Sequence, residues 1–218
     1  MSTLRLAVPP GRAGRLWLVQ RLAVARRAAG LLDRKLLVLT AELDRARATA
    51  GRTGLEWDTA CREAQQALLR AVLLGGERAT RLAGGGADAQ VTISYAATMG
   101  TPYPADARYT IGDPEGWDGA AVAAARQAHR AALGAAARHA AAAAALAVIE
   151  TETTTTRHRL RAVRDRWIPG LSQVLVQVEF ALEETERDDA ARLRIVRRGP
   201  GLRGDGRGPP AAGPAADA

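Results

Sequence analysis

Apolar residues recur at alternating spacings of three and four along the first part of the chain. Ten such positions in a row are apolar: Leu18, Leu22, Ala25, Ala29, Leu32, Leu36, Leu39, Leu43, Ala46 and Ala50. The same register continues through Thr53, Trp57, Ala60, Ala64, Ala67, Ala71 and Leu74, where only Thr53 is polar. A seam sustained over so many heptads is typical of a coiled coil.

The seam predicts one helix from about Arg12 to about Leu82, which at ~1.5 Å per residue would be on the order of 100 Å long. Gly51 and Gly54 lie inside it, and each lowers helix stability by roughly 1 kcal/mol. We interpret these two glycines as a soft spot in the helix, and not as its end.

A second helical pattern begins near Gly119. It passes through four successive threonines, Thr153–Thr156, which are poor helix formers that a seam partner would have to hold in place. Its seam then runs through Leu160, Val163, Trp167, Leu171, Val174, Val178 and Leu182. Pro169-Gly170 interrupts this seam, although proline lacks a backbone donor and clashes with the preceding turn.

The segment between the helices has a different period. Val91, Ile93 and Tyr95 alternate with polar residues, and a second alternation follows at 108–111, with Gly100, Pro102 and Pro104 between the two. Period two predicts a small β-hairpin on a flexible neck, with an irregular loop as the alternative. The glycine- and proline-rich residues 199–218 have no periodicity, which favours a disordered tail.

The expected organisation is therefore all-α, a long antiparallel two-helix coiled coil with a small β-hairpin or irregular middle region. We divide it into an N-terminal helix (1–83), a hairpin and neck (84–118), a C-terminal helix (119–198) and a tail (199–218).

Charge predicts the antiparallel orientation. The chain has a formal net charge of +8, and residues 1–50 hold ten basic and three acidic side chains, a net +7. The acidic residues of 179–189 are Glu179, Glu183, Glu184, Glu186, Asp188 and Asp189. Antiparallel pairing places the region 12–27 beside this acidic stretch, and such complementarity can select orientation although single surface pairs contribute little.

Candidate chemistry is sparse. Gly84–Gly86 lack the lysine of a phosphate-binding loop, and His129, His139 and His158 have no cysteine or carboxylate at metal-ligand spacing. We interpret the three histidines as ordinary exposed helix residues, and Cys61 as structural. We expect no catalytic, metal or cofactor site, no signal peptide, and no segment apolar enough for a membrane helix.

Two blocks at opposite ends of the chain resemble one family. Residues 157–198 and 8–39 are similar to the C-terminal and N-terminal helices of the D subunit of V-type/A-type ATPases. The C-terminal match falls on Arg159, Trp167, Ile168, Pro169, Leu171, Val178, Leu182, Glu184, Glu186, Arg187, Arg192, Leu193 and Val196. The N-terminal match falls on Pro10, Arg12, Leu16, Leu18, Arg21, Leu22, Ala25, Arg27, Leu31, Leu32 and Lys35. The blocks cover about a third of the chain; Gly11, Gly170 and the middle region depart from the family's pattern.

The resemblance implies a non-catalytic central-stalk rotor subunit, without a cofactor, on the cytoplasmic face of the cell membrane as a peripheral component. It would couple ATP hydrolysis or synthesis in a ring of A and B subunits to proton or sodium transport. Further partners implied are the F subunit and a membrane-side subunit linking to the ion-carrying ring, with no nucleic acid and no direct membrane insertion. Pro169 and Gly170 would bend the shaft. Contacts to the ring would come from Arg12, Arg21, Arg187, Arg192 and Arg194.

Two other functions remain open from the residues alone. A net charge of +8 suits a basic coiled coil that binds nucleic acid, although no aromatic residues are interleaved with the arginines. A membrane-surface scaffold is the other alternative, although a concentrated apolar face outside the seam is missing.

Overall fold

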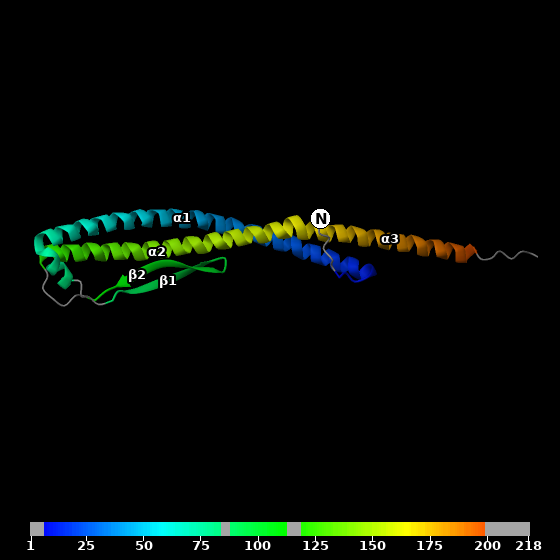
Figure 1. Cartoon of the computed structure of the whole chain (residues 1–218). Helices are drawn as coiled ribbons and strands as arrows, with labels where there is room; N and C mark the ends of the chain where they lie inside the picture. Colours follow the sequence, from blue (N-terminus) through cyan, green and yellow to red (C-terminus); the bar gives the residue numbers. More distant parts are fainter. Residues whose placement is uncertain (1–6, 84–87, 113–118, 199–218) are drawn as a thin grey trace, which may run out of the picture. The chain divides into compact units, whose positions relative to one another are not determined.

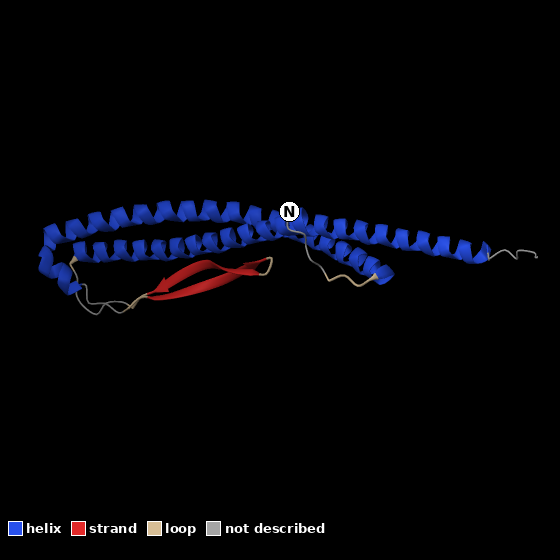
Figure 2. Ribbon diagram, turned by 45° about the vertical axis from the view of Figure 1, so that its right-hand side comes forward, coloured by secondary structure: helices blue, strands red, loops and turns tan. Residues whose placement is uncertain are grey.

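The computed structural model describes residues 7–83, 88–112 and 119–198 and is mostly helical (Figure 2). Helix α1 spans Gly11–Ala83, strands β1 and β2 span Gln90–Thr98 and Thr101–Thr110, and helix α2 spans Ala120–Arg161. A π-helix, η1 (Ala162–Trp167), joins α2 to helix α3 (Ile168–Arg198). The predicted fold class, two long helices with a small hairpin, is confirmed. The expected disorder of 199–218 and the flexible neck at 84–87 and 113–118 lie outside the described residues.

The chain forms two compact units. One contains residues 22–169 and the other contains both ends, 1–21 and 170–218. In the larger unit α1 and α2 run side by side (Figure 1), and their facing residues form a narrow core. Among the seam positions of α1 in this unit, Leu39, Leu22 and Leu43 are buried, whereas Leu32 and Leu36 are half-buried.

The threonine run is helical because its partner helix covers it. Thr153 and Thr156 are each only 1% exposed. Thr153 Oγ1 donates to the Ile149 carbonyl at 2.7 Å, so that its hydroxyl is satisfied within its own helix. Poor intrinsic propensity is thus overridden by packing.

Cross-helix ion pairs confirm the antiparallel orientation of this unit. Arg164 pairs with Asp33 at 2.7 Å, and Glu150 pairs with Arg47 at 3.2 Å, so later residues of α1 meet earlier residues of the second helix. Lys35, the only lysine, reaches Glu152 at 2.7 Å. The hydrogen bond from Lys35 lowers the pKa of the Glu152 carboxyl below its usual value.

The helix expected from about Arg12 to about Leu82 is present but kinked near its end, and the expectation that its seam extends to Leu74 was wrong. The helix continues through Gly51 and Gly54 as predicted, but it kinks at Gly76, whose φ of 74° and ψ of 163° are not helical. Only glycine adopts such a conformation without strain. Leu74, next to this kink, is 80% exposed instead of lying in the seam, and Trp57 is 41% exposed at its edge.

The hairpin is longer than the alternation indicated. Met99 and Gly100, both with positive φ, form its two-residue turn. Pro102 and Pro104, expected between the strands, lie within β2 opposite Ala97 and Tyr95. Proline is tolerated there because a two-stranded sheet has free edges where no backbone donor is needed.

The hairpin packs along α2 (Figure 1). Ala107 of β2 is buried, and the Tyr109 hydroxyl donates to the Arg130 carbonyl of α2 at 2.6 Å. The Tyr109 ring lies over Gly134, where an added Cβ would be 2.7 Å from its Cε1 atom. Near the turn, the Tyr103 hydroxyl donates to Glu42 of α1 at 3.0 Å. The hairpin is therefore docked on the helix pair through two tyrosines.

Pro169 does not end the second helix, because the turn before it widens. The backbone N–H of Ile168 bonds to the Val163 carbonyl, five residues earlier. A π-type turn of this kind rearranges the hydrogen bonding just where proline removes a donor and crowds the preceding carbonyl. No sequence pattern indicated this π-helix, and a bend at Pro169-Gly170 stays a prediction.

The helical run Ala120–Arg197 contains an 18-residue window with a mean hydropathy of 1.6, which is long and apolar enough to cross a membrane by length and composition. The sequence expectation that no segment passes this criterion was therefore wrong. Core helices of soluble proteins pass it too, and 39% of this window is buried inside the protein. Alanine supplies much of the apolar character of α2.

Candidate functional site at the paired helix ends

The smaller unit pairs the beginning of α1 with α3. Its core is formed by Leu18 and Leu171, both with 0% exposure. The seam then continues through half-buried positions of α3, which are Val174, Val178 and Leu182. The beginning of α1 and α3 therefore lie side by side, as the complementary charge blocks predicted.

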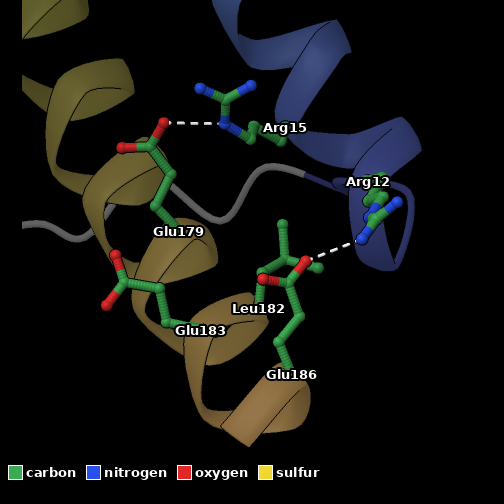
Figure 3. A pocket seen from close by; sticks show the side chains of 6 residues that line it. All are labelled: Arg12, Arg15, Glu179, Leu182, Glu183 and Glu186. Carbon is green, nitrogen blue, oxygen red and sulfur yellow. Dashed lines mark hydrogen bonds and ion pairs between the residues drawn. The ribbon is translucent and has the colours of Figure 1, made fainter. Parts of the chain in front are cut away.

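Two ion pairs hold these ends together (Figure 3). Arg12 donates to Glu186 at 2.7 Å and Arg15 donates to Glu179 at 2.8 Å. With Leu182 and Glu183, these four residues line an open groove between the helices. Because the four charged side chains are 37–83% exposed, each pair contributes only about 0–1 kcal/mol. The two ion pairs therefore contribute more to the alignment of the helices than to their stability.

The five arginines expected to contact a surrounding ring are all engaged by their own chain. Arg12 holds Glu186, and Arg21 lies 5.1 Å from the centre of the Trp17 ring. On α3, Arg187 pairs with Glu183, Arg192 with Asp189, and Arg194 with the Ala190 carbonyl. These local contacts still leave the arginines at the surface, and their role toward a partner stays a prediction.

Exposed apolar side chains on the same helix were not predicted from the sequence. Leu193, Ile195 and Val196 are 62–75% exposed near the end of α3, and Val176 and Phe180 are 64% and 62% exposed. The three-four spacing counts only seam positions, so it gives no signal for apolar residues that lie off the seam. Apolar surface at a helix end is a candidate for contact with another protein.

The candidate chemical groups do not assemble. Cys61 is half-buried on α1, and within the described ranges no three His, Cys, Asp or Glu side chains are grouped so as to hold a metal. His129 and His158 are exposed as expected, whereas the expectation was wrong for His139, which is half-buried against α1.

Cysteines in place of Arg12 and Glu186, with Cys61→Ser, are expected to crosslink within one chain through a short bismaleimide. The reason is the direct 2.7 Å contact of the two side chains. Pairing Arg12→Cys with Val176→Cys is the control, because about ten helical residues displace the second thiol by ~15 Å. The readout is the monomer-to-dimer ratio on a denaturing gel. Predominantly dimeric product from the 12/186 pair would contradict the fold-back of the chain.

The described residues form antiparallel pairs of long helices, in two units, with a β-hairpin docked on both helices of the larger unit. A family model for the D subunit of ATP synthase matches residues 16–198. The chain is 32% identical over 201 residues to a V-type ATP synthase D subunit from Anaeromyxobacter sp. (strain Fw109-5), covering 87% of this chain and 92% of the relative. It is 33% identical over 200 residues to a V-type ATP synthase D subunit from Anaeromyxobacter dehalogenans (strain 2CP-C), covering 85% of this chain and 93% of the relative. The chain belongs to the family of ATP synthase D subunits.

Proposed function

We propose that this chain is the central-stalk rotor subunit of a V/A-type rotary ATPase. It couples ATP hydrolysis or synthesis in a ring of A and B subunits to proton or sodium transport across the membrane. The observation that carries the proposal is the family match over residues 16–198, which includes both long helices and the hairpin. The shaft itself performs no chemistry and needs no cofactor.

The protein works as a peripheral component on the cytoplasmic face of the cell membrane. Its partners are the A and B subunits around the paired ends, the F subunit, and a membrane-side subunit that links it to the ion-carrying ring. It binds no nucleic acid and does not insert into the membrane. The cross-helix ion pairs support the first point, because Arg12, Arg15, Arg47 and Arg164 each contact a carboxylate of the same chain.

Each segment has its own role in this proposal. Residues 1–83 and 119–198 are the shaft helices, residues 84–118 carry the docked hairpin, and residues 199–218 are a tail without a mechanical role. The seam from Leu18 to Leu43 and from Leu171 to Leu182 keeps the helices together under torque. Pro169-Gly170, which follows the π-helix after one residue, bends the shaft so that it presents unequal faces to the ring.

Coupling of rotation to catalysis depends on a difference in contact free energy between the shaft and the surrounding catalytic interfaces. Rotation favours one catalytic interface over another only if the shaft binds the two conformations with different free energies. Shifting a two-state interface from 1:99 to 99:1 needs about 5.5 kcal/mol. Exposed arginine contacts supply at most about 1 kcal/mol each, whereas burying one large aliphatic side chain supplies about 1.5–3 kcal/mol. The exposed Leu193, Ile195 and Val196 are therefore the stronger candidates for the ring contact, with the arginines setting alignment.

Assembly with separately purified A, B and F subunits tests the proposal. The full-length chain is expected to co-elute with the A/B ring and with the F subunit, and to give the ring rotation driven by ATP. The matched control is the chain with Arg12→Glu and Arg15→Glu, which opposes the pairing to Glu186 and Glu179 and should assemble less well. A chain that ignores the ring but binds DNA with a steep salt dependence would overturn the proposal, as would sedimentation with liposomes alone.

A further inference from the structure

The seam in the middle of the larger unit does not by itself specify how the two helices align. The buried seam residues there are mostly alanine: Ala50, Ala64 and Ala71 on α1, and Ala125, Ala132, Ala135, Ala141 and Ala145 on α2. A slip of one heptad would again place mostly alanine opposite alanine. Because the side chains exchanged are largely identical, burial alone distinguishes these alignments poorly. The larger buried side chains Leu39, Leu43 and Ile149 lie outside this stretch, so within it another feature has to distinguish the alignments.

One interruption of the alanine seam is specific to a single alignment. The ring of His139, on α2, lies over Gly54 of α1, where an added Cβ would be 3.2 Å from the ring's Cε1 atom. The indole of Trp57 stacks on the same ring, with centroids 5.4 Å apart and planes 20° apart. An added Cβ at residue 54 would therefore crowd the imidazole by a few tenths of an ångström.

A hydrogen bond closes this arrangement. Thr53 Oγ1 donates to the Thr49 carbonyl at 2.9 Å, and His139 Nδ1 lies 3.3 Å from the same oxygen. With the hydroxyl proton on the backbone carbonyl, Oγ1 can accept a hydrogen bond from Nδ1 in the tautomer that carries its proton there. Thr53 is 8% exposed, so an alignment that removes His139 leaves a buried oxygen with one fewer donor.

A slip of seven residues destroys the fit in both directions. His139 would then lie opposite Arg47 or Cys61, whose side chains occupy the space that Gly54 leaves open. Gly54 in turn would face Ala132, which is too small to fill the gap, or Leu146, which has no donor for the Thr53 hydroxyl oxygen. Polar residues at single seam positions are known to specify coiled-coil register in this way.

We propose that His139, seated over Gly54 and bonded to Thr53, is the positioning residue that fixes the alignment of α1 against α2. The inference stands on these contacts and does not depend on the proposed function. If the chain is a rotor, a slip of seven residues would shift one helix by ~10.5 Å and misplace every face of the shaft.

Crosslinks that report the alignment test the proposal on the full chain with Cys61→Ser. Arg47→Cys with Glu150→Cys reports the native register, because these two side chains are in contact. Arg47→Cys with Ala143→Cys, or with Arg157→Cys, reports the two heptad slips. In the otherwise unchanged chain the native pair should dominate. His139→Ala is expected to raise the slipped products by ~10-fold or more, while His129→Ala, an exposed histidine of the same helix, should leave them unchanged.

A glycine pair separates register from helix stability. Gly51→Ala and Gly54→Ala raise helix propensity equally, but a Cβ at 51 meets nothing within 4 Å whereas one at 54 meets His139. Only Gly54→Ala should therefore increase the slipped crosslinks, despite its better helix propensity. If His139→Ala fails to fold, this comparison of the two glycines still tests whether His139 fixes the register.

Two results would overturn the proposal. The first is that Gly51→Ala and Gly54→Ala give the same crosslinks, all of them from the native register. The second is release of slipped products by Lys35→Ala but not by His139→Ala, which would assign the register to the Lys35–Glu152 ion pair.

Discussion

Deleting residues 187–218 is expected to stop ATP-driven rotation of the assembled complex, whereas deleting residues 199–218 alone should leave rotation close to normal. The longer deletion keeps Glu186 and Glu179, so both ion pairs of the paired ends survive. It removes the exposed Leu193, Ile195 and Val196 together. At about 1.5–3 kcal/mol for each side chain buried in a partner, their combined loss is comparable to the ~5.5 kcal/mol that switching one interface requires.

Rotation or ion pumping of the complex is the measurement, with gel filtration to establish that the shortened chain still assembles. Arg192→Ala should be mild, because it removes one exposed contact of about 1 kcal/mol or less. Replacing Leu193, Ile195 and Val196 with serine should reproduce most of the defect without shortening the chain. If deletion of 199–218 already stops torque and the longer deletion adds nothing, the contact lies beyond residue 198.

Gly134→Ala is expected to release the hairpin from α2 while leaving the coiled coil intact. An added Cβ would be 2.7 Å from Cε1 of Tyr109, closer than real Cβ atoms approach a neighbour. Overpacking of this kind costs about 1–3 kcal/mol, while the same substitution raises the helix propensity of α2 by about 1 kcal/mol. The substitution is therefore expected to destabilise the docked hairpin and to stabilise helix α2.

Hydrogen exchange distinguishes these two effects, because it reports on the hairpin and on α2 separately. Amides of Gln90–Thr98 and Thr101–Thr110 should exchange faster in Gly134→Ala, while those of α2 stay protected or become more so. Tyr109→Phe is the matched control, because it keeps the ring and loses only the bond to the Arg130 carbonyl, worth about 0.5–1.5 kcal/mol. In the assembled complex the released hairpin should alter ATPase rate or coupling without preventing assembly. Unchanged exchange in the hairpin would show that Tyr109 is not seated on Gly134 in solution.

The helices, their orientation and the family could be predicted from periodicity, charge and motifs alone. Apolar residues at three-four spacing can be buried only on one stripe of a helix, so the seams through Leu39 and Leu171 followed from periodicity. Opposite charges at the two ends selected the fold-back, because a parallel pair would have left both blocks without partners. The hairpin was predicted from its alternation, although its prolines were placed outside the strands.

Features that depend on space left open in a neighbouring helix could be recognised only in the folded chain. Gly54 was interpreted from the sequence as part of a soft spot, but in the fold Gly54 and Gly134 receive the rings of His139 and Tyr109. The π-helix before Pro169 and the kink at Gly76 are likewise local adjustments of the backbone. Hydrophobic periodicity reports which face of a helix is buried, and it carries no information about which side chain of another element fills a gap. That choice depends on the shapes of residues far apart in the chain, which meet only after folding.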